Sequence, residues 1–333
     1  MSLTLKNLMF DRAQKSIEFS LGISPTSNLF LLRGSGSTKP SPFELMVYIN
    51  IQGYHTIKYD ICQIFLANSV FFCYSLIGDF LKRYIKHDIV RLEYYETLPS
   101  TNTALKEKAL NGEKEGLVII AGNQTAGRGR FNRKFYSPSV SGIYMSILLR
   151  PKTSGFDTTL LTTAAAVSVA KSAENLSGKK TQIKWVNDVL IEGKKICGIL
   201  TEGAINPKTA TPDYIVLGIG VNAFTPENGF DKEIENIATS VFSTPDPDLK
   251  ARLTAEIINT FFDIYKDLES KNFLDEYKSR SAVIGKEINV IKNSTVVSAK
   301  ALDIDDKCRL LVEYGDKTRE FLQSGEISIK IKE

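Results

Sequence analysis

Apolar residues recur with two different periods from Asp88 onward, and this alternation predicts an α+β body. Residues 89–95 alternate between apolar and polar as in a half-buried strand, whereas residues 117–120 and 214–221 are mostly apolar, as in buried strands. No G-x-G-x-x-G follows the first strand, which argues against a Rossmann domain. Further strands are predicted at 141–149, 182–185, 189–191 and 195–202, and helices at 99–110, 158–176 and 248–280. We therefore expect a mixed sheet backed by helices.

The last fifty residues change in character. They contain short strand-like stretches separated by turns, an even spacing that is typical of a small β-barrel. These stretches are 287–291, 296–304, 309–314, 318–322 and 327–330. The chain is thus predicted to divide into an N-terminal segment of unassigned fold and unknown role (1–87), a main body (88–283) and a C-terminal barrel (284–333).

The N-terminal segment has little clean periodicity. Its Ser/Pro/Gly-rich residues 34–42 are typical of a linker or loop. Residues 61–78 carry no charge, and their number is close to the lower limit for a membrane span. Polar residues interrupt this run and Asp79 follows at once, so we favour a buried helix over a membrane anchor. The N-terminus shows no secretory signal pattern.

Composition narrows the function classes. The 333 residues suffice for two or three domains, and the net charge of +4 suits an anionic small substrate better than nucleic acid. The four cysteines form no CxxC pair, so we expect a reducing, cytoplasmic location. Both histidines, His55 and His87, precede the body. The body is therefore expected to work without a Ser-His-Asp triad or a His-ligated zinc ion.

Residues 122–134 (GNQTAGRGRFNRK) carry the most informative chemistry. Glycines allow unusual backbone angles and close approach to a ligand, while each interleaved arginine offers a planar fork of donors to carboxylate or phosphate. Such a loop can close over an anionic intermediate. By its shape alone, a solvated basic loop that binds nothing specific is an equally good interpretation.

Three shorter motifs are ambiguous when taken singly. Residues 184–188 (KWVND) place an ammonium group beside a turn, but an exposed strand lysine is the simpler explanation. Residues 218–222 (GIGVN) end a strand with an amide that can bind a base or ribose, or that merely caps the strand. Residues 100–102 (STN) are most often a helix N-cap, although a helix start also binds anionic or polar groups.

Together, in this order and at these spacings, the motifs resemble the biotin–protein ligase family. The matching segments are STN, QTAGRGRFNRK, FYSP, KWVND, KKICGIL, GIGVN and GEISIK, and they run from about residue 88 to 330. The resemblance implies a class II synthetase-like catalytic domain with an SH3-like C-terminal barrel. It also implies ATP-dependent activation of biotin to biotinyl-5'-AMP and transfer to a lysine of a biotin carboxyl carrier domain, as in a biotin–[acetyl-CoA-carboxylase] ligase.

The resemblance also implies roles for individual residues. Biotin would be bound by Ser100, Thr101, Asn102, Gln124, Arg128, Gly129, Arg130 and Lys184. ATP would be bound by Arg128, Arg130, Phe135, Lys184 and Asn222. The catalytic group would comprise Arg128, Arg130, Lys184 and Asp188. Three positions depart from the family pattern: Val186 replaces a proline, Asn132 a glycine and Phe135 a tryptophan, which removes an N–H donor.

The implied chemistry suits these residue types. The biotin carboxylate must attack the α-phosphate of ATP, and cationic side chains together with Mg²⁺ would relieve the crowding of negative charge. Which residues would hold the metal is left open. Neither step needs a strong base from the protein, in keeping with a body that lacks histidine. The family pattern also implies that the body can form a homodimer.

Two alternatives stay open at this point. A lipoate–protein ligase or octanoyl transferase would share the fold, and Cys197 would be the nucleophile of the transferase. We interpret Cys197 as a core residue, because its apolar neighbours would raise the pKa of its thiol. A biotin-sensing transcriptional regulator would carry an N-terminal winged helix. Residues 1–90 show no basic recognition helix after a glycine turn, so a DNA partner is not expected.

Overall fold

The computed structural model describes residues 81–329, apart from 140, 293–294 and 324–325, together with three short N-terminal strands. The chain forms two compact units, Met1–Ser75 and Leu76–Glu333. In the first unit β1 (Leu29–Arg33), β2 (Leu45–Ile49) and β3 (Ile57–Asp60) form an antiparallel sheet in the order β1-β2-β3. The linker at 34–42 and the apolar run at 61–78 lie outside the described residues. No described helix is long and apolar enough to cross a membrane.

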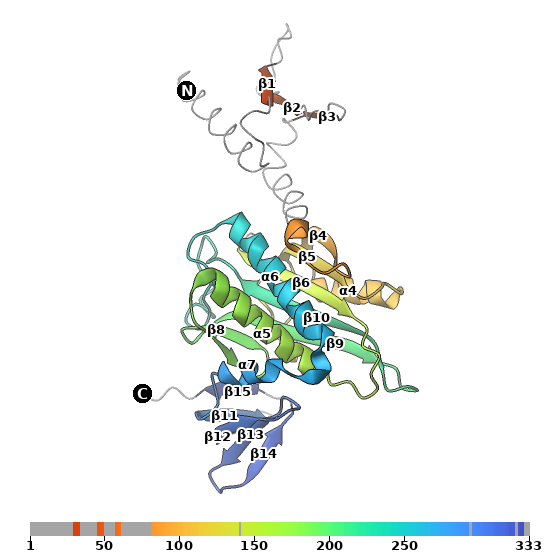
Figure 1. The fold of residues 1–333 in the computed structure, drawn as a ribbon. Coiled ribbons are helices and arrows are strands. Elements are labelled where there is room, and N and C mark those ends of the chain that lie inside the picture. Colours follow the sequence, from red (N-terminus) through yellow and green to blue (C-terminus); the bar gives the residue numbers. More distant parts are fainter. Residues whose placement is uncertain are drawn as a thin grey trace. The chain divides into compact units, whose positions relative to one another are not determined.

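A seven-stranded sheet forms the centre of the second unit (Figure 1). The β4–β5 pair is parallel and every other pair is antiparallel, so the predicted mixed sheet is confirmed. The strand order is β4-β5-β6-β10-β9-β8-β7. Their bounds are β4 (Arg91–Leu98), β5 (Leu117–Gln124), β6 (Gly142–Leu149), β7 (Thr181–Lys184), β8 (Asp188–Ile191), β9 (Lys194–Ile205) and β10 (Pro212–Asn222).

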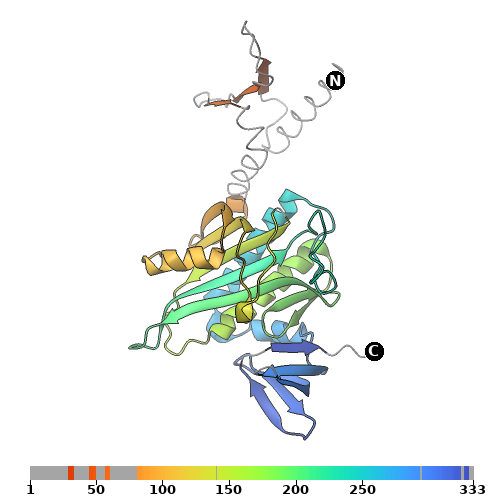
Figure 2. The same ribbon diagram turned by 180° about the vertical axis from the view of Figure 1, so that it is seen from behind.

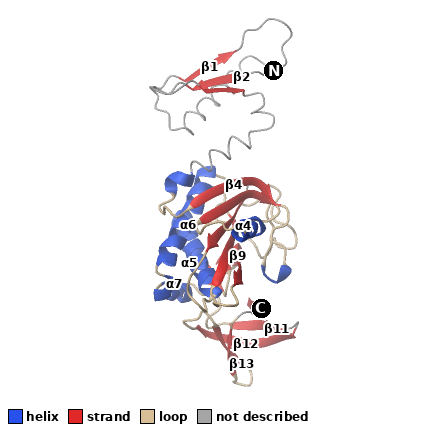
Figure 3. Cartoon of the chain, turned by 90° about the vertical axis from the view of Figure 1, so that its right-hand side faces the viewer, coloured by secondary structure: helices blue, strands red, loops and turns tan. Residues whose placement is uncertain are grey.

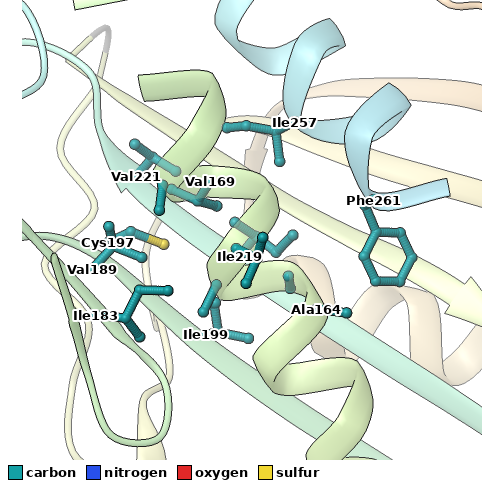
Figure 4. Packing of buried hydrophobic residues seen from close by; sticks show 14 of the residues in the cluster. Ala164, Val169, Ile183, Val189, Cys197, Ile199, Ile219, Val221, Ile257 and Phe261 are labelled. Carbon is teal, nitrogen blue, oxygen red and sulfur yellow. The ribbon is translucent and has the colours of Figure 1, made fainter. Parts of the chain in front are cut away.

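Helices cover both faces of this sheet (Figures 1 and 3). The long helices α5 (Thr158–Ser177) and α6 (Pro247–Lys266) pack on one face, where small residues of α5 let it lie close to the strands, as Figure 4 shows. The short helix α4 (Thr101–Leu110) packs on the other face. Alternation along β5 supplies both cores, since Val118 packs under α5 and Ile119 under α4.

The helix predicted at 248–280 is not continuous. It begins as α6 after the cap Asp246 and ends at Lys266, and a 3-10 turn (η2, Leu268–Ser270) leads to α7 (Phe273–Ser279). Lys271 adopts a left-handed conformation (φ +57°) between them. The break turns the apolar residues of α7 back onto the core, and neither glycine nor proline marks the position in the sequence. Tertiary packing thus overrode a local pattern that favoured one helix.

The C-terminal residues form a five-stranded antiparallel sheet (Figure 2). This confirms the predicted small all-β domain appended to the body. Its order is β14-β13-β12-β11-β15, and its strands are β11 (Glu287–Lys292), β12 (Thr295–Ile304), β13 (Leu310–Tyr314), β14 (Arg319–Leu322) and β15 (Glu326–Ile329).

Candidate active site

A cleft of about 470 Å³, measured to its open mouth, lies on the α4 face of the central sheet. The first turn of α4 and the end of β5 form its inner end. Strands β6, β9 and β10 form its floor, and the Gly/Arg loop that follows β5 forms its outer wall. The predicted residues that line it are Ser100, Thr101, Asn102, Gln124, Arg128, Gly129, Arg130 and Phe135. The fold thus brings together residues that lie up to 35 positions apart along the chain.

The first turn of α4 supplies buried polar groups rather than a simple helix cap. Ser100 is the N-cap residue, yet its side chain makes no capping hydrogen bond. Asn102 is 5% exposed, and its amide orientation is fixed because Nδ2 donates to Glu202 Oε2 at 2.9 Å and to the Leu200 carbonyl at 3.3 Å. Its Oδ1 accepts from Ser146 Oγ at 2.6 Å. One lone pair of Asn102 Oδ1 therefore remains for a ligand.

Gln124 complements Asn102 with the opposite hydrogen-bonding capacity. Its Oε1 accepts from the Thr101 backbone N–H at 2.9 Å and from Thr101 Oγ1 at 3.2 Å, which uses both lone pairs. Its Nε2 donates one hydrogen to Ser137 Oγ at 3.0 Å. One N–H of Gln124 therefore remains. The inner end of the cleft can thus offer one donor and one acceptor to the same ligand head group.

The two glycines of the GIGVN motif make room for cleft side chains. A Cβ atom on Gly218 would lie 2.1 Å from Asn102 Oδ1, and a Cβ atom on Gly220 would lie 2.5 Å from the Phe135 ring. Any side chain at either position would displace a residue of the cleft. Asn222 is not among the described residues that line the cleft. Its Nδ2 donates to the carbonyls of Thr239 at 3.1 Å and Lys195 at 3.4 Å, so Asn222 holds the backbone behind the cleft.

Three cationic side chains line the cleft, and each has a partner. Arg128 pairs with Glu202 Oε1 at 3.0 Å. Arg130 donates from Nη1 to Asn187 Oδ1 at 2.9 Å. Lys195 pairs with Asp188 Oδ1 at 2.7 Å. Glu202 also accepts from Asn102 of α4, and Asn187 also donates to the carbonyl of Ile199 on β9. The positions of the two arginines are therefore set by the sheet and by the turn after β7.

Lys195 is the charged lining residue that sequence reasoning missed, and Asn187 is a polar one. Lys184 ends β7 and is half-buried, and it is not among the described residues that line the cleft. Lys195 lies in the KKICGIL segment, which contains a β-bulge. Val189 of β8 pairs with Cys197 of β9, but the next residue, Leu190, pairs with Lys195, so β9 has one extra residue here. The bulge shifts the phase of β9, so that both Ile196 and Cys197 are buried while Lys195 reaches the cleft. Period-two alternation in the sequence cannot reveal such a shift.

Cys197 behaves as the predicted core residue. It is 1% exposed, packs under α5, and burial raises the pKa of its thiol far above the usual range. A thiol held in its neutral form is a poor nucleophile. Within the described part of the chain, no three His, Cys, Asp or Glu side chains group together as metal ligands would.

The fold and the cleft define an α+β domain whose cleft combines buried amides with cationic side chains, which suits a small ligand with a polar head group and an anionic tail; an antiparallel β-domain follows it. Residues 94–222 match the Biotin/lipoate A/B protein ligase family, and residues 283–330 match the Biotin protein ligase C terminal domain. The chain belongs to the biotin–protein ligase family.

Known relatives share most of the second unit. The chain is 35% identical over 229 residues to "Bifunctional ligase/repressor BirA" of Bacillus subtilis, which covers 68% of this chain and 70% of that protein. It is 31% identical over 230 residues to "Biotin--[acetyl-CoA-carboxylase] ligase" of Mycobacterium tuberculosis, which covers 66% of this chain and 82% of that protein. The biotin protein ligase from Aquifex aeolicus in complex with biotin and ATP shares the fold, with a TM-score of 0.60 at 24% identity, over 73% of this chain and 99% of that one.

Proposed function

We propose that the protein activates biotin with ATP to biotinyl-5'-AMP and transfers the biotinyl group to a lysine of a biotin carboxyl carrier domain. One observation carries the proposal: a single cleft joins a donor–acceptor amide pair at its inner end to three cations further out. The ligase activity of the family supports the proposal. In the Aquifex aeolicus protein, the same fold is found in complex with biotin and ATP.

The amide pair favours biotin over lipoate or octanoate. The ureido ring of biotin has a carbonyl that accepts from Gln124 Nε2 and an N–H that donates to Asn102 Oδ1. A dithiolane or an alkyl chain has neither group, so binding one of these would leave two buried polar atoms without partners. Each such atom costs about 1–3 kcal/mol, which amounts to roughly five- to a hundredfold in affinity per atom.

The cations would act on the two chemical steps. In the first step an oxygen of the biotin carboxylate attacks the α-phosphorus of ATP, and the bond to pyrophosphate breaks. Lys195 and Arg128 would stabilise the negative oxygens that crowd together there, and the Gly/Arg loop with Arg130 would retain the acyl-adenylate. In the second step the neutral amine of the acceptor lysine attacks the acyl carbon, AMP leaves, and the amine loses a proton. The sequence-based expectation that Lys184 fills this role stays a prediction.

Mg²⁺ has no preformed site among the described residues. Asp188 and Glu202 are the acidic residues that face the cleft cations, and each is already paired with one of them. A Mg²⁺ ion bound to ATP is usually held largely by phosphate oxygens and water. Mg²⁺ would therefore arrive with the nucleotide, and we derive no step through it.

The remaining parts of the proposal concern partners and organisation. The acceptor is proposed to be the carrier domain of a carboxylase. The catalytic domain is proposed to span residues 88–283 and to be able to form a homodimer. The enzyme is proposed to act in the cytoplasm. Several relatives named ligase/repressor suggest a second activity. We propose ligation alone, because ligation is the activity that the cleft supports.

The decisive experiment is pyrophosphate exchange into ATP with the full chain. Exchange is expected with biotin and not with lipoate or octanoate, followed by ATP-dependent labelling of an apo carrier domain. Exchange driven by lipoate or octanoate instead of biotin would overturn the biotin assignment. A Gln124→Glu variant should lose the biotin-dependent exchange, because the biotin carbonyl would then face a carboxylate instead of the N–H donor of Gln124.

A further inference from the structure

The turn between β7 and β8 holds two of the three cleft cations. Asn187 Oδ1 accepts from Arg130 at 2.9 Å, and the next residue, Asp188, pairs with Lys195 at 2.7 Å. Asn187 is in turn bonded to Ile199 on the floor of the cleft, through its Nδ2 at 3.1 Å and its backbone carbonyl at 3.0 Å. The position of this turn therefore fixes both cations relative to the floor.

The same turn is held from behind by the C-terminal part of the chain. The Trp185 indole N–H donates to the carbonyl of Cys308, between β12 and β13, at 2.8 Å. The Tyr277 hydroxyl of α7 donates to the carbonyl of Val186 at 3.1 Å. Both side chains are almost completely buried, with exposures of 3% for Trp185 and 1% for Tyr277. Burial also raises the pKa of Tyr277 well above its usual value, so the hydroxyl keeps the proton that it donates.

Cys308 is itself anchored to the body. It is fully buried, its backbone is left-handed (φ +60°), and its Sγ lies 3.3 Å from Thr163 Oγ1 of α5. Next to this contact, the Ile183 backbone is bonded to Arg280 and Ala282 at 2.8 Å each, so β7 is joined to the segment that leads into the C-terminal sheet. The C-terminal sheet is therefore built against the back of the turn that carries Asn187 and Asp188.

We propose that Trp185 and Tyr277 are positioning residues, which hold Arg130 through the turn between β7 and β8 and so slow release of the acyl-adenylate. Neither lines the cleft among the described residues. Each fixes the backbone of the turn, the turn fixes Asn187, and Asn187 holds the guanidinium of Arg130 at the cleft. The inference rests on the proposed function, because it concerns the intermediate formed in the same cleft.

The test compares two tyrosines that make the same kind of contact in different places. Tyr277→Phe removes the hydrogen bond to the turn and leaves the aromatic ring in place. Tyr265→Phe is the matched control. Tyr265 lies on α6, its hydroxyl donates to Glu115 Oε1 at 2.6 Å, and neither residue is among those that line the cleft. Release of radiolabelled biotinyl-AMP from the full chain is expected to be about three- to tenfold faster in Tyr277→Phe, as loss of one hydrogen bond allows. It should be unchanged in Tyr265→Phe.

A double-variant cycle identifies the route of the effect. If Tyr277 acts through Arg130, then Tyr277→Phe adds nothing to the release rate in an Arg130→Ala background. Equal release in the two tyrosine variants, or additive effects with Arg130→Ala, would overturn the proposal. If Tyr277→Phe does not fold, Trp185→Phe applies the same test from the other anchor. A wild-type chain that forms no adenylate from biotin and ATP would instead overturn the proposed function.

Discussion

Replacing Lys195 by alanine removes a charge from the floor of the cleft and leaves Asp188 without its partner. A hydrogen bond from a charged group contributes about 1.5–3 kcal/mol, which corresponds to roughly a ten- to hundredfold slower formation of biotinyl-AMP. The unpaired Asp188 carboxylate, whose side chain is 21% exposed, would add repulsion against the incoming phosphates. At a separation of about 5 Å and an effective dielectric constant of about 20, two unit charges repel by roughly 3 kcal/mol. We therefore expect formation to slow by at least about a hundredfold.

The assay is single-turnover formation of biotinyl-AMP, measured beside its rate of release. Lys194→Ala is the matched control, because Lys194 is the neighbouring lysine on β9 and is exposed. It should form the intermediate at the wild-type rate. Adding Asp188→Asn to Lys195→Ala should recover part of the lost rate, because the amide removes the repulsion.

Lys184→Ala provides the direct comparison with the expectation drawn from the sequence. If geometry is the correct guide, Lys184→Ala reduces formation less than Lys195→Ala does. A normal rate in Lys195→Ala together with a hundredfold loss in Lys184→Ala would refute the reasoning, because it would place the working ammonium group on β7 rather than on β9.

Three further outcomes are expected. Gly218→Ala should lower biotin affinity at least tenfold in equilibrium binding without ATP, since its methyl group would lie only 2.1 Å from Asn102 Oδ1; unchanged affinity would contradict the assigned head-group site. Arg130→Ala should speed release of biotinyl-AMP about tenfold and slow its formation less, as the loss of one charge-assisted contact suggests; a loss of formation with normal release would show a rigid catalytic loop. The hydrogen bond from Arg280 lowers the pKa of Glu174, so this pair stabilises the fold at neutral pH and the stability is lost as the pH falls through that lowered pKa. Glu174→Gln should therefore lower the melting temperature at pH 7 and lower it less at a pH below that lowered pKa, with a change under about 1 kcal/mol because the pair is partly exposed; an equal effect at both pH values would exclude the ionic contribution.

The positions of strands and helices could be predicted where local patterns act alone. Helix α5 begins after Asp157, which accepts from the Thr159 N–H, and ends at the left-handed Gly178, so both ends are set by neighbouring residues. The break after Lys266 could not be predicted in this way. It depends on buried contacts of Phe273, Leu274 and Tyr277 with residues distant in sequence.

The sequence by itself determined which chemical groups the cleft contains. The STN and Gly/Arg motifs supply the amides and arginines, because the residue types and their order do not depend on how the chain packs. Only the tertiary structure decided which lysine joins them. The bulge on β9 turns Lys195 toward the cleft, and contacts across the sheet select Asp188 as its partner. Such contacts arise when distant strands pair, and a phase shift of one residue reverses the face that a side chain occupies.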